Sequence, residues 1–136
     1  MNMTQKQLSE DILAFLGKLK KVLLEAGEEH GVTPIQLSAL YGINRTGELP
    51  MGQFASVLHC DPSNVTGIVD RLVSQKLVVR RECAQDRRSK LLALTPEGKA
   101  IVEELEQELP GRIGCNVLSG AQCGELHTLL QKIIKA

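Results

Sequence analysis

Apolar residues recur at helical spacing in the first thirty residues of the chain. The spacing predicts a helix over about residues 4–29, which Gly31 ends. Its apolar stripe comprises Leu8, Ile12, Phe15, Leu16, Leu19 and Leu23. Leu13 and Leu24 add apolar surface outside that stripe. Since apolar residues on more than one face indicate more than one packing partner, we expect this helix to meet a second partner as well as the chain's own core.

A second helix is predicted after a threonine-proline pair. Thr33 is a typical N-cap and Pro34 suits the first helical position, so the helix covers about 34–43. The residues expected to face inward are Ile35, Leu37, Leu40 and Tyr41. A polar turn is expected over residues 44–48.

Two further helices follow closely and form a helix-turn-helix. The first covers residues 51–58, with Phe54, Ala55 and Leu58 buried. A tight turn over 59–61 ends in Asp61-Pro62, a second cap-plus-proline signal, and the next helix covers about 62–75. Its apolar stripe comprises Val65, Ile68, Val69, Leu72 and Val73. This pattern is typical of a helix with one buried and one exposed face.

After Lys76 the pattern changes to that of a β-hairpin. Residues 77–83 suit a short strand, 84–90 a polar tip and 91–94 the returning strand. Thr95-Pro96 then starts a helix that reaches at least Leu109, where Pro110 and Gly111 are expected to end or kink it. A capping box of Ser119 and Gln122 starts the last helix. Its stripe comprises Leu126, Leu129, Leu130, Ile133 and Ile134.

The predicted fold is therefore mainly α with a small two-stranded β wing, a winged helix-turn-helix within a single compact chain of 136 residues. The major groove of DNA admits one α-helix, whose first residues reach base edges. The residues predicted to face that groove are Ser63, Asn64, Thr66, Gly67 and Arg71. Asn64 suits the edge of adenine, whereas Arg71 is left open between a phosphate and a guanine. Ser63 and free N–H groups near Pro62 are expected to bind phosphate.

The hairpin carries the second group of candidate DNA ligands. Arg87, Arg88 and Lys90 lie at or near its tip, and arginine on a thin ribbon suits the narrow minor groove. We expect Asp86 to hold one of these arginines in a salt bridge. Asp70 is expected to pair with a base such as Arg71, or to accept a hydrogen bond from cytosine.

Charge is segregated along the chain although the net charge is zero. Residues 71–90 carry a local charge of +5 and residues 97–109 a local charge of −4. One face can therefore be electropositive while the molecule stays neutral. Glu103, Glu104, Glu106 and Glu108 are interpreted as an exposed helix face.

Three motifs in this region resemble the signature of the MarR family of transcriptional regulators. They are Val69-Asp70-Arg71-Leu72, Asp86-Arg87-Arg88 and Leu94-Thr95-Pro96-Glu97-Gly98. The chain departs from the family pattern at Leu77, where glycine is usual, and at Gly67, where a longer and often basic side chain is common. The resemblance implies DNA-binding roles for Asp86 and Arg88 in the wing, and for Ser63, Asn64 and Thr66 in the groove.

The same resemblance implies how the chain is organised and regulated. Residues 1–32 and 110–136 are expected to form a helical dimerisation region around the winged helix-turn-helix at 33–109. The expected function is that of a homodimeric regulator, a repressor that binds a pseudo-palindromic site in double-stranded DNA. A small-molecule effector would release it, from a cleft between the dimer helices and the winged region.

Two other functions stay open from the sequence. A winged helix can act as a protein-interaction module without DNA, which the zero net charge and Gly67 favour. A thiol- or metal-responsive regulator is the other, although Cys60, Cys83, Cys115 and Cys123 show no C-x-x-C spacing and suit free thiols. His30, His59 and His127 show no ligand spacing, so no metal site is expected.

The sequence argues against catalysis and against a membrane location. No Ser-His-Asp arrangement, glycine-rich phosphate loop or H-E-x-x-H motif is present, so neither an enzyme nor a cofactor is expected. The first residues do not suit a signal peptide, and no apolar run spans a bilayer. We therefore expect a cytoplasmic protein.

Overall fold

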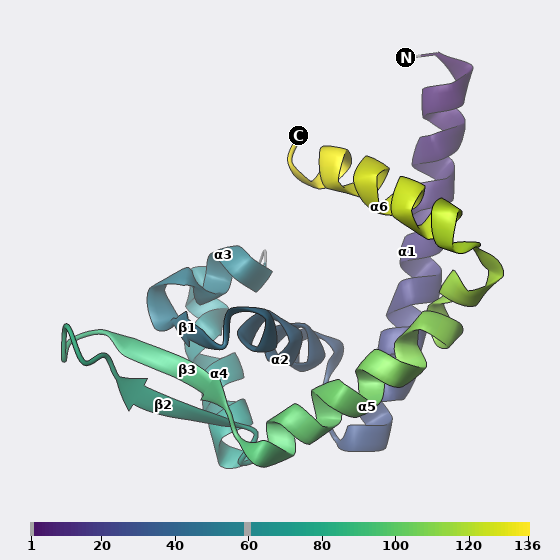
Figure 1. The fold of residues 1–136 in the computed structure, drawn as a ribbon. Helices are drawn as coiled ribbons and strands as arrows, with labels where there is room; N and C mark the ends of the chain where they lie inside the picture. The colour runs from purple at the N-terminus through teal and green to yellow at the C-terminus, as the bar shows by residue number, and fades with distance from the viewer. Residues whose placement is uncertain (1, 59–60) are drawn as a thin grey trace.

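The computed structural model describes residues 2–58 and 61–136 and confirms a mainly helical chain with a small antiparallel sheet (Figure 1). The predictions made for His59 and Cys60 lie outside the described residues. A long helix, α1 (Met3–His30), stands beside α5 (Pro96–Ile113), and the winged region lies to one side of both (Figure 1). The last helix, α6 (Gly120–Ile134), lies near the N-terminal half of α1.

Three of the predicted helix boundaries are confirmed by their local geometry. Thr33 Oγ1 accepts from the Gln36 backbone N–H, and the Gln36 side chain accepts in return from the Thr33 N–H at 2.8 Å, which starts α2 (Pro34–Thr46). A second capping box, of Ser119 and Gln122, starts α6. Gly31 ends α1 at φ 69°, a left-handed conformation that glycine adopts without strain.

The helix-turn-helix is shorter in regular structure than its pattern predicts. A 3₁₀ turn over Met51–Gln53 precedes α3 (Phe54–Leu58), and another over Pro62–Asn64 precedes α4 (Val65–Ser74). The buried stripe of α4 is confirmed: Val65, Val69 and Leu72 are buried, while Ile68 and Val73 are half-buried. The exposed face of α4 is therefore defined by the core packing of the opposite face.

The sheet has three strands, where the sequence predicts two. β2 (Val78–Glu82) and β3 (Lys90–Leu94) form the predicted hairpin, and β1 (Glu48–Pro50) pairs with the other edge of β3. The polar turn expected over 44–48 is also wrong, because α2 continues to Thr46. Leu49 is buried opposite Leu92, so one side chain is enough to fix this strand. A single apolar residue gives no alternating pattern to detect.

Helix α5 passes through Pro110 without ending there. Proline removes one backbone donor, but the helix continues to Ile113 and ends at Gly114, with φ 103°. Beyond the proline, Arg112 Nη2 lies 2.9 Å from Glu29 Oε1 and 3.0 Å from Glu108 Oε2. The hydrogen bond with Glu29 raises the pKa of Arg112 above its ordinary value. The pairs join the last turn of α5 to the end of α1.

The left-handed residue at the exit of α4 is Lys76 rather than Leu77. Lys76 has φ 61°, which costs a residue with a side chain about 1 kcal/mol relative to glycine. Leu77 is buried, and its carbonyl lies against Gly98 at the start of α5, where an added Cβ would sit 2.2 Å from the Leu77 oxygen. Residue 98 must therefore be glycine for the wing and α5 to meet.

The core lies in the winged region and at the end of α1, whereas the terminal helices leave apolar surface uncovered. Phe54, Leu40, Leu72, Leu92 and Leu105 are fully buried. The N-terminal half of α1 and the whole of α6 contribute apolar side chains that are 42 to 66% exposed. They are Leu8, Ile12, Leu13, Phe15, Leu16, Leu126, Leu129, Leu130, Ile133 and Ile134. These residues are clustered on two helices, whereas a stable monomer normally exposes apolar side chains singly.

Candidate nucleic-acid interface

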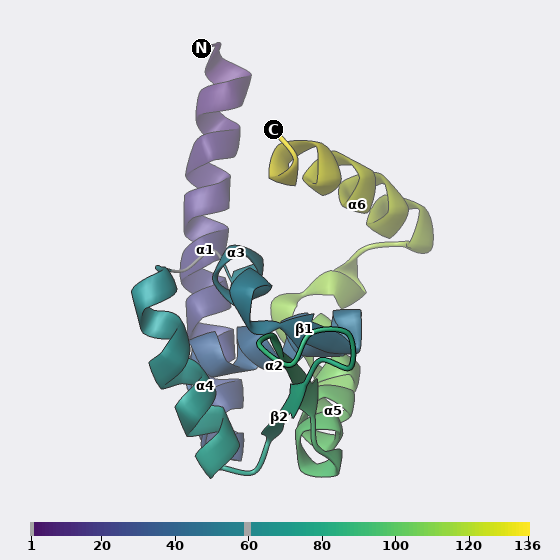
Figure 2. The ribbon, with the colours of Figure 1, turned by 90° about the vertical axis from the view of Figure 1, so that its left-hand side faces the viewer.

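The exposed face of α4 is small and polar, as predicted. All five residues expected in the groove are exposed: Ser63, Asn64, Thr66, Gly67 and Arg71. Helix α4 lies at the edge of the molecule, on the opposite side from α5 with its acidic residues (Figure 2). Helix α4 is therefore available to a large partner.

Asp70 does not pair with its neighbour Arg71. Its carboxylate pairs with the guanidinium of Arg80, on β2, which joins the recognition helix to the base of the wing. The pair occupies Asp70, so the alternative in which this carboxylate reads cytosine also loses support. Arg80 is a residue that the sequence did not single out, because pairing across ten residues and two elements leaves no local signal.

A polar network joins the other side of α4 to the corner between α1 and α2. Gln75 Nε2 donates to the Gly31 carbonyl at 2.8 Å, and Gln36 Nε2 donates to Gln75 Oε1 at 3.1 Å. Gln36 is only 4% exposed, and its Oε1 accepts from the Thr33 N–H. Since a buried amide with all partners satisfied resists movement, these bonds hold α4 at a fixed position relative to α1 and α2.

The 3₁₀ turn that precedes α4 is capped by a residue of the chain itself. Asp61 Oδ1 accepts from the Ser63 backbone N–H at 3.0 Å, and this bond lowers the pKa of Asp61 below its ordinary value. The Ser63 N–H is therefore already used, which contradicts the expectation that it is free for phosphate. Ser63 as a whole remains exposed.

Asp86 shapes the wing tip by a different contact from the one predicted. Its Oδ1 accepts from the Arg88 backbone N–H at 3.0 Å, so it closes the turn instead of forming a salt bridge with an arginine side chain. Within residues 2–58 and 61–136, no carboxylate lies within 4 Å of the guanidinium of Arg87 or Arg88. Lys90 differs, because its Nζ lies 3.4 Å from Glu82 Oε1 on the paired strand.

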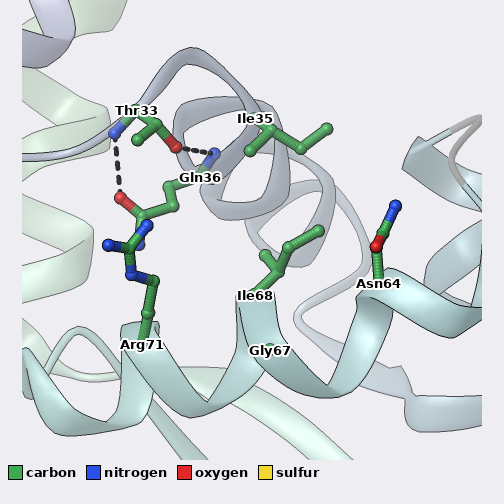
Figure 3. A pocket seen from close by; sticks show the side chains of 7 residues that line it. All are labelled: Thr33, Ile35, Gln36, Asn64, Gly67, Ile68 and Arg71. Atoms are coloured by element: carbon green, nitrogen blue, oxygen red, sulfur yellow. Dashed lines mark hydrogen bonds between the residues drawn. The ribbon is translucent and has the colours of Figure 1, made fainter.

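An open cleft runs between the first turn of α2 and the length of α4 (Figure 3). Its volume is about 460 Å³. Asn64, Ile68 and Arg71 point from α4 toward α2, and Ile35 faces them from α2 (Figure 3). Ile35 was predicted to be inward but is 37% exposed, because α2 buries its Leu37 and Leu40 side instead.

Side chains that could bind a metal ion are not clustered in the part of the chain that the structure describes. No cluster of three or more histidine, cysteine or acidic side chains could hold a metal ion there. Cys83, Cys115 and Cys123 are free thiols. No helix among these residues combines the length and the apolar character needed to cross a bilayer.

The fold and this surface define a winged helix-turn-helix protein, and comparison with known proteins gives its family. A family model described as MarR family matches residues 30–89. The transcriptional repressor MdtR of Bacillus subtilis is 37% identical over 103 residues, which cover 76% of this chain and 65% of MdtR. The aligned part of the chain thus spans slightly less than two thirds of that relative. The winged region of the chain, residues 30–89, matches the MarR family, as its motifs indicated.

Solved structures agree over almost the whole chain. A MarR variant from E. coli in complex with operator DNA is 27% identical, with a TM-score of 0.74 and 98% of this chain and 99% of that chain covered. BpsR of Bordetella bronchiseptica is 24% identical, with a TM-score of 0.72 over 93% of this chain and 98% of that chain. The DNA binding of BpsR is regulated by 6-hydroxynicotinic acid. At this level of identity, the likeness to BpsR shows the fold alone. The relatives are regulators of transcription, so the expectation of a protein that is not an enzyme is confirmed.

Proposed function

We propose that the chain is a DNA-binding transcription repressor that places α4 in the major groove and the wing tip in the adjacent minor groove. The observation that carries the proposal is the exposed polar face of α4 beside two arginines, Arg87 and Arg88, that no described carboxylate neutralises. An arginine left without a partner at the end of a thin ribbon has its charge available for the negative potential of the minor groove. The likeness to a MarR protein bound to operator DNA supports this placement.

Selection of bound fragments from the source genome tests the proposal. The recovered fragments are expected to share an inverted repeat whose half-sites lie about one helical turn apart, and binding should weaken steeply with salt. Fragments upstream of transcription units that are derepressed on deletion would support repression, the role that the name of MdtR also suggests. Failure to enrich any fragment at low salt would favour the alternative, a protein-interaction module.

We propose that a second copy covers the apolar surface of the terminal helices. Leu8, Ile12 and Phe15 of α1 face Leu126, Leu130 and Ile133 of α6 across a groove of about 540 Å³. Its lining is almost wholly apolar, and such a surface is typical of a permanent interface between subunits. The proposed dimerisation region is therefore 1–32 with 110–136, and the proposed DNA-binding region is 33–109.

Leu130→Glu is expected to convert the dimer to a monomer. Leu130 is half-exposed in the single chain, so the glutamate harms the fold of one chain little but would bury a charge in the interface. Duplex affinity should fall more than tenfold, because each half-site would then bind alone. Sedimentation velocity measures the change, with Ala100→Glu on the exposed face of α5 as the matched control. A dimer that survives Leu130→Glu would contradict the proposed interface.

We further propose that a small organic anion binds between the terminal helices and the winged region. A cleft of about 520 Å³ is lined there by apolar residues from five helices, α1, α2, α3, α5 and α6, together with Ser38, Tyr41 and Arg45. Arg45 supplies the charge for a carboxylate. Burial, with a smaller contribution from Glu106, raises the pKa of Tyr41, so its hydroxyl stays a neutral donor. A regulator whose DNA binding responds to an aromatic acid shares this fold.

Tyr41 offers a direct test of this cleft. The chain has one tyrosine and no tryptophan, so its fluorescence reports on the cleft alone. Titration with benzoate, a simple aromatic carboxylate, is expected to quench Tyr41, and Arg45→Ala should weaken the apparent affinity about tenfold by removing a charge-assisted hydrogen bond. Equal quenching in both proteins would show that Arg45 does not bind the carboxylate.

A thiol-responsive regulator is the remaining alternative. Cys115 and Cys123 are exposed and Cys83 is half-buried, so all three are open to an oxidant. Diamide should change duplex affinity if one of the chain's four cysteines is a sensor, and serine replacement of that cysteine alone should abolish the change. Measurement of duplex affinity with added zinc, in place of diamide, tests whether the regulator responds to a metal ion.

A further inference from the structure

The cleft between α2 and α4 combines an apolar floor with a polar rim. Ile35 and Ile68 form the floor, and Asn64 and Arg71 stand at the rim (Figure 3). At Gly67, between them, no atom lies within 4 Å of the position that a Cβ would take, so the mouth of the cleft is open. A sugar-phosphate strand has the matching chemistry, since each deoxyribose has an apolar face and each phosphate carries one negative charge.

Arg71 is the charged group of this cleft, and it faces away from the wing. Within the described residues, Arg80, Arg81 and Arg112 each have a carboxylate within 4 Å, but Arg71 has none. Its guanidinium extends beside Thr33 and Gln36 of α2 (Figure 3). It therefore lies at the α2 side of the exposed face, at one end of the cleft that Asn64 and Gly67 also line. Such a position suits a strand passing along the helix better than a base in front of it.

The two walls of the cleft are held in place before any ligand binds. Gln36 joins α2 to Gln75 of α4, and Gln75 in turn bonds the carbonyl of Gly31. On the opposite flank of α4, Asp70 is tied to Arg80 of the wing. Since a fixed surface loses little entropy when it binds, a contact made here adds to affinity at small cost.

We propose that this cleft seats one sugar-phosphate strand of the duplex, with Arg71 binding a phosphate and not a guanine. The inference rests on the proposed function, since it requires α4 to lie in the major groove. A helix in that groove has one strand along each flank. The wing occupies one flank, and the cleft lies on the other. Ile35 and Ile68 contact the deoxyribose, so the strand is recognised by its chemistry and not by its base sequence.

Ile35→Glu tests whether the strand enters the cleft. A glutamate in the first turn of α2 favours the helix, so the fold is preserved, but it would repel a phosphate. Affinity should fall at least tenfold for both the selected operator and a scrambled duplex of equal length. Ala100→Glu is the control, because residue 100 is exposed on α5, outside both the cleft and the proposed dimerisation region. It should change affinity less than twofold.

Arg71→Gln and Ile35→Ser separate the charge from the apolar contact. Arg71→Gln should reduce the slope of log affinity against log salt by about one per protomer and leave the base preference unchanged. Ile35→Ser should weaken binding severalfold with the slope unchanged. Wild-type affinity in Ile35→Glu, or a changed base preference in Arg71→Gln, would overturn the inference while the proposed function stands. A wild-type chain that binds no duplex would overturn both.

Discussion

Arg88→Glu is expected to lower the affinity for the selected operator by about a hundredfold or more. The proposed dimer would present two wings. Each charge reversal would remove one phosphate contact, with the counterion that it releases, and would add a repulsion in the minor groove. The slope of log affinity against log salt should fall by about two per dimer for the same reason. The fold should be unaffected, because Arg88 contributes only its backbone N–H to the turn, through Asp86. Fluorescence anisotropy at several salt concentrations measures both quantities.

Lys99→Glu is the control for this change. Lys99 is an exposed cation on α5, where neighbouring residues are acidic, and it undergoes the same change of charge away from the proposed interface. It should lower affinity only slightly, through the long-range field of the protein. Equal losses in the two variants would show that net charge, not the wing, governs binding.

Gly98→Ala is expected to destabilise the protein by about 3 kcal/mol, which is large for the addition of one methyl group. The new Cβ would lie 2.2 Å from the Leu77 carbonyl oxygen, and 3.2 Å from its carbon. Both are backbone atoms at the junction of α4, the wing and α5, so no side chain can turn aside to relieve the contact. Thermal unfolding at a fixed protein concentration measures the change.

Gly111→Ala in the same helix gives the opposite expectation. No atom lies within 4 Å of its Cβ position, so alanine relieves the entropic cost of glycine in a helix and stabilises the protein by up to about 1 kcal/mol. If Gly98→Ala unfolded at the wild-type temperature, the close approach between α5 and the Leu77 carbonyl would be wrong.

The parts of the fold that the sequence predicted are those with local causes. The caps at Thr33, Thr95 and Ser119 depend on residues three apart, and the stripe on α4 depends on one helical period. Both signals are complete within a short segment. The hairpin was predicted in the same way, from the change to a strand pattern after Lys76, and β2 and β3 confirm it.

The parts that were missed depend on contacts between distant segments. Strand β1 pairs with β3 where Leu49 meets Leu92, forty-three residues along the chain, and the last turn of α5, beyond Pro110, is joined to α1 by the pair of Arg112 with Glu29. Asp70 prefers Arg80 on the neighbouring strand to Arg71 beside it. Ile35 was assigned to the core because it is apolar, whereas its place in the first turn of α2 turns it toward the open cleft. Periodicity cannot show which of several possible partners a residue meets in space.

Protection from dimethyl sulphate tests the central claim most directly, because the reagent methylates guanine N7 in the major groove and adenine N3 in the minor groove. On the selected operator, the protein should protect two N7 segments centred about one helical turn apart, with protected adenine N3 atoms outside each segment where the wings lie. A stable complex that leaves N7 reactivity unchanged in both half-sites would contradict the placement of α4 in the major groove.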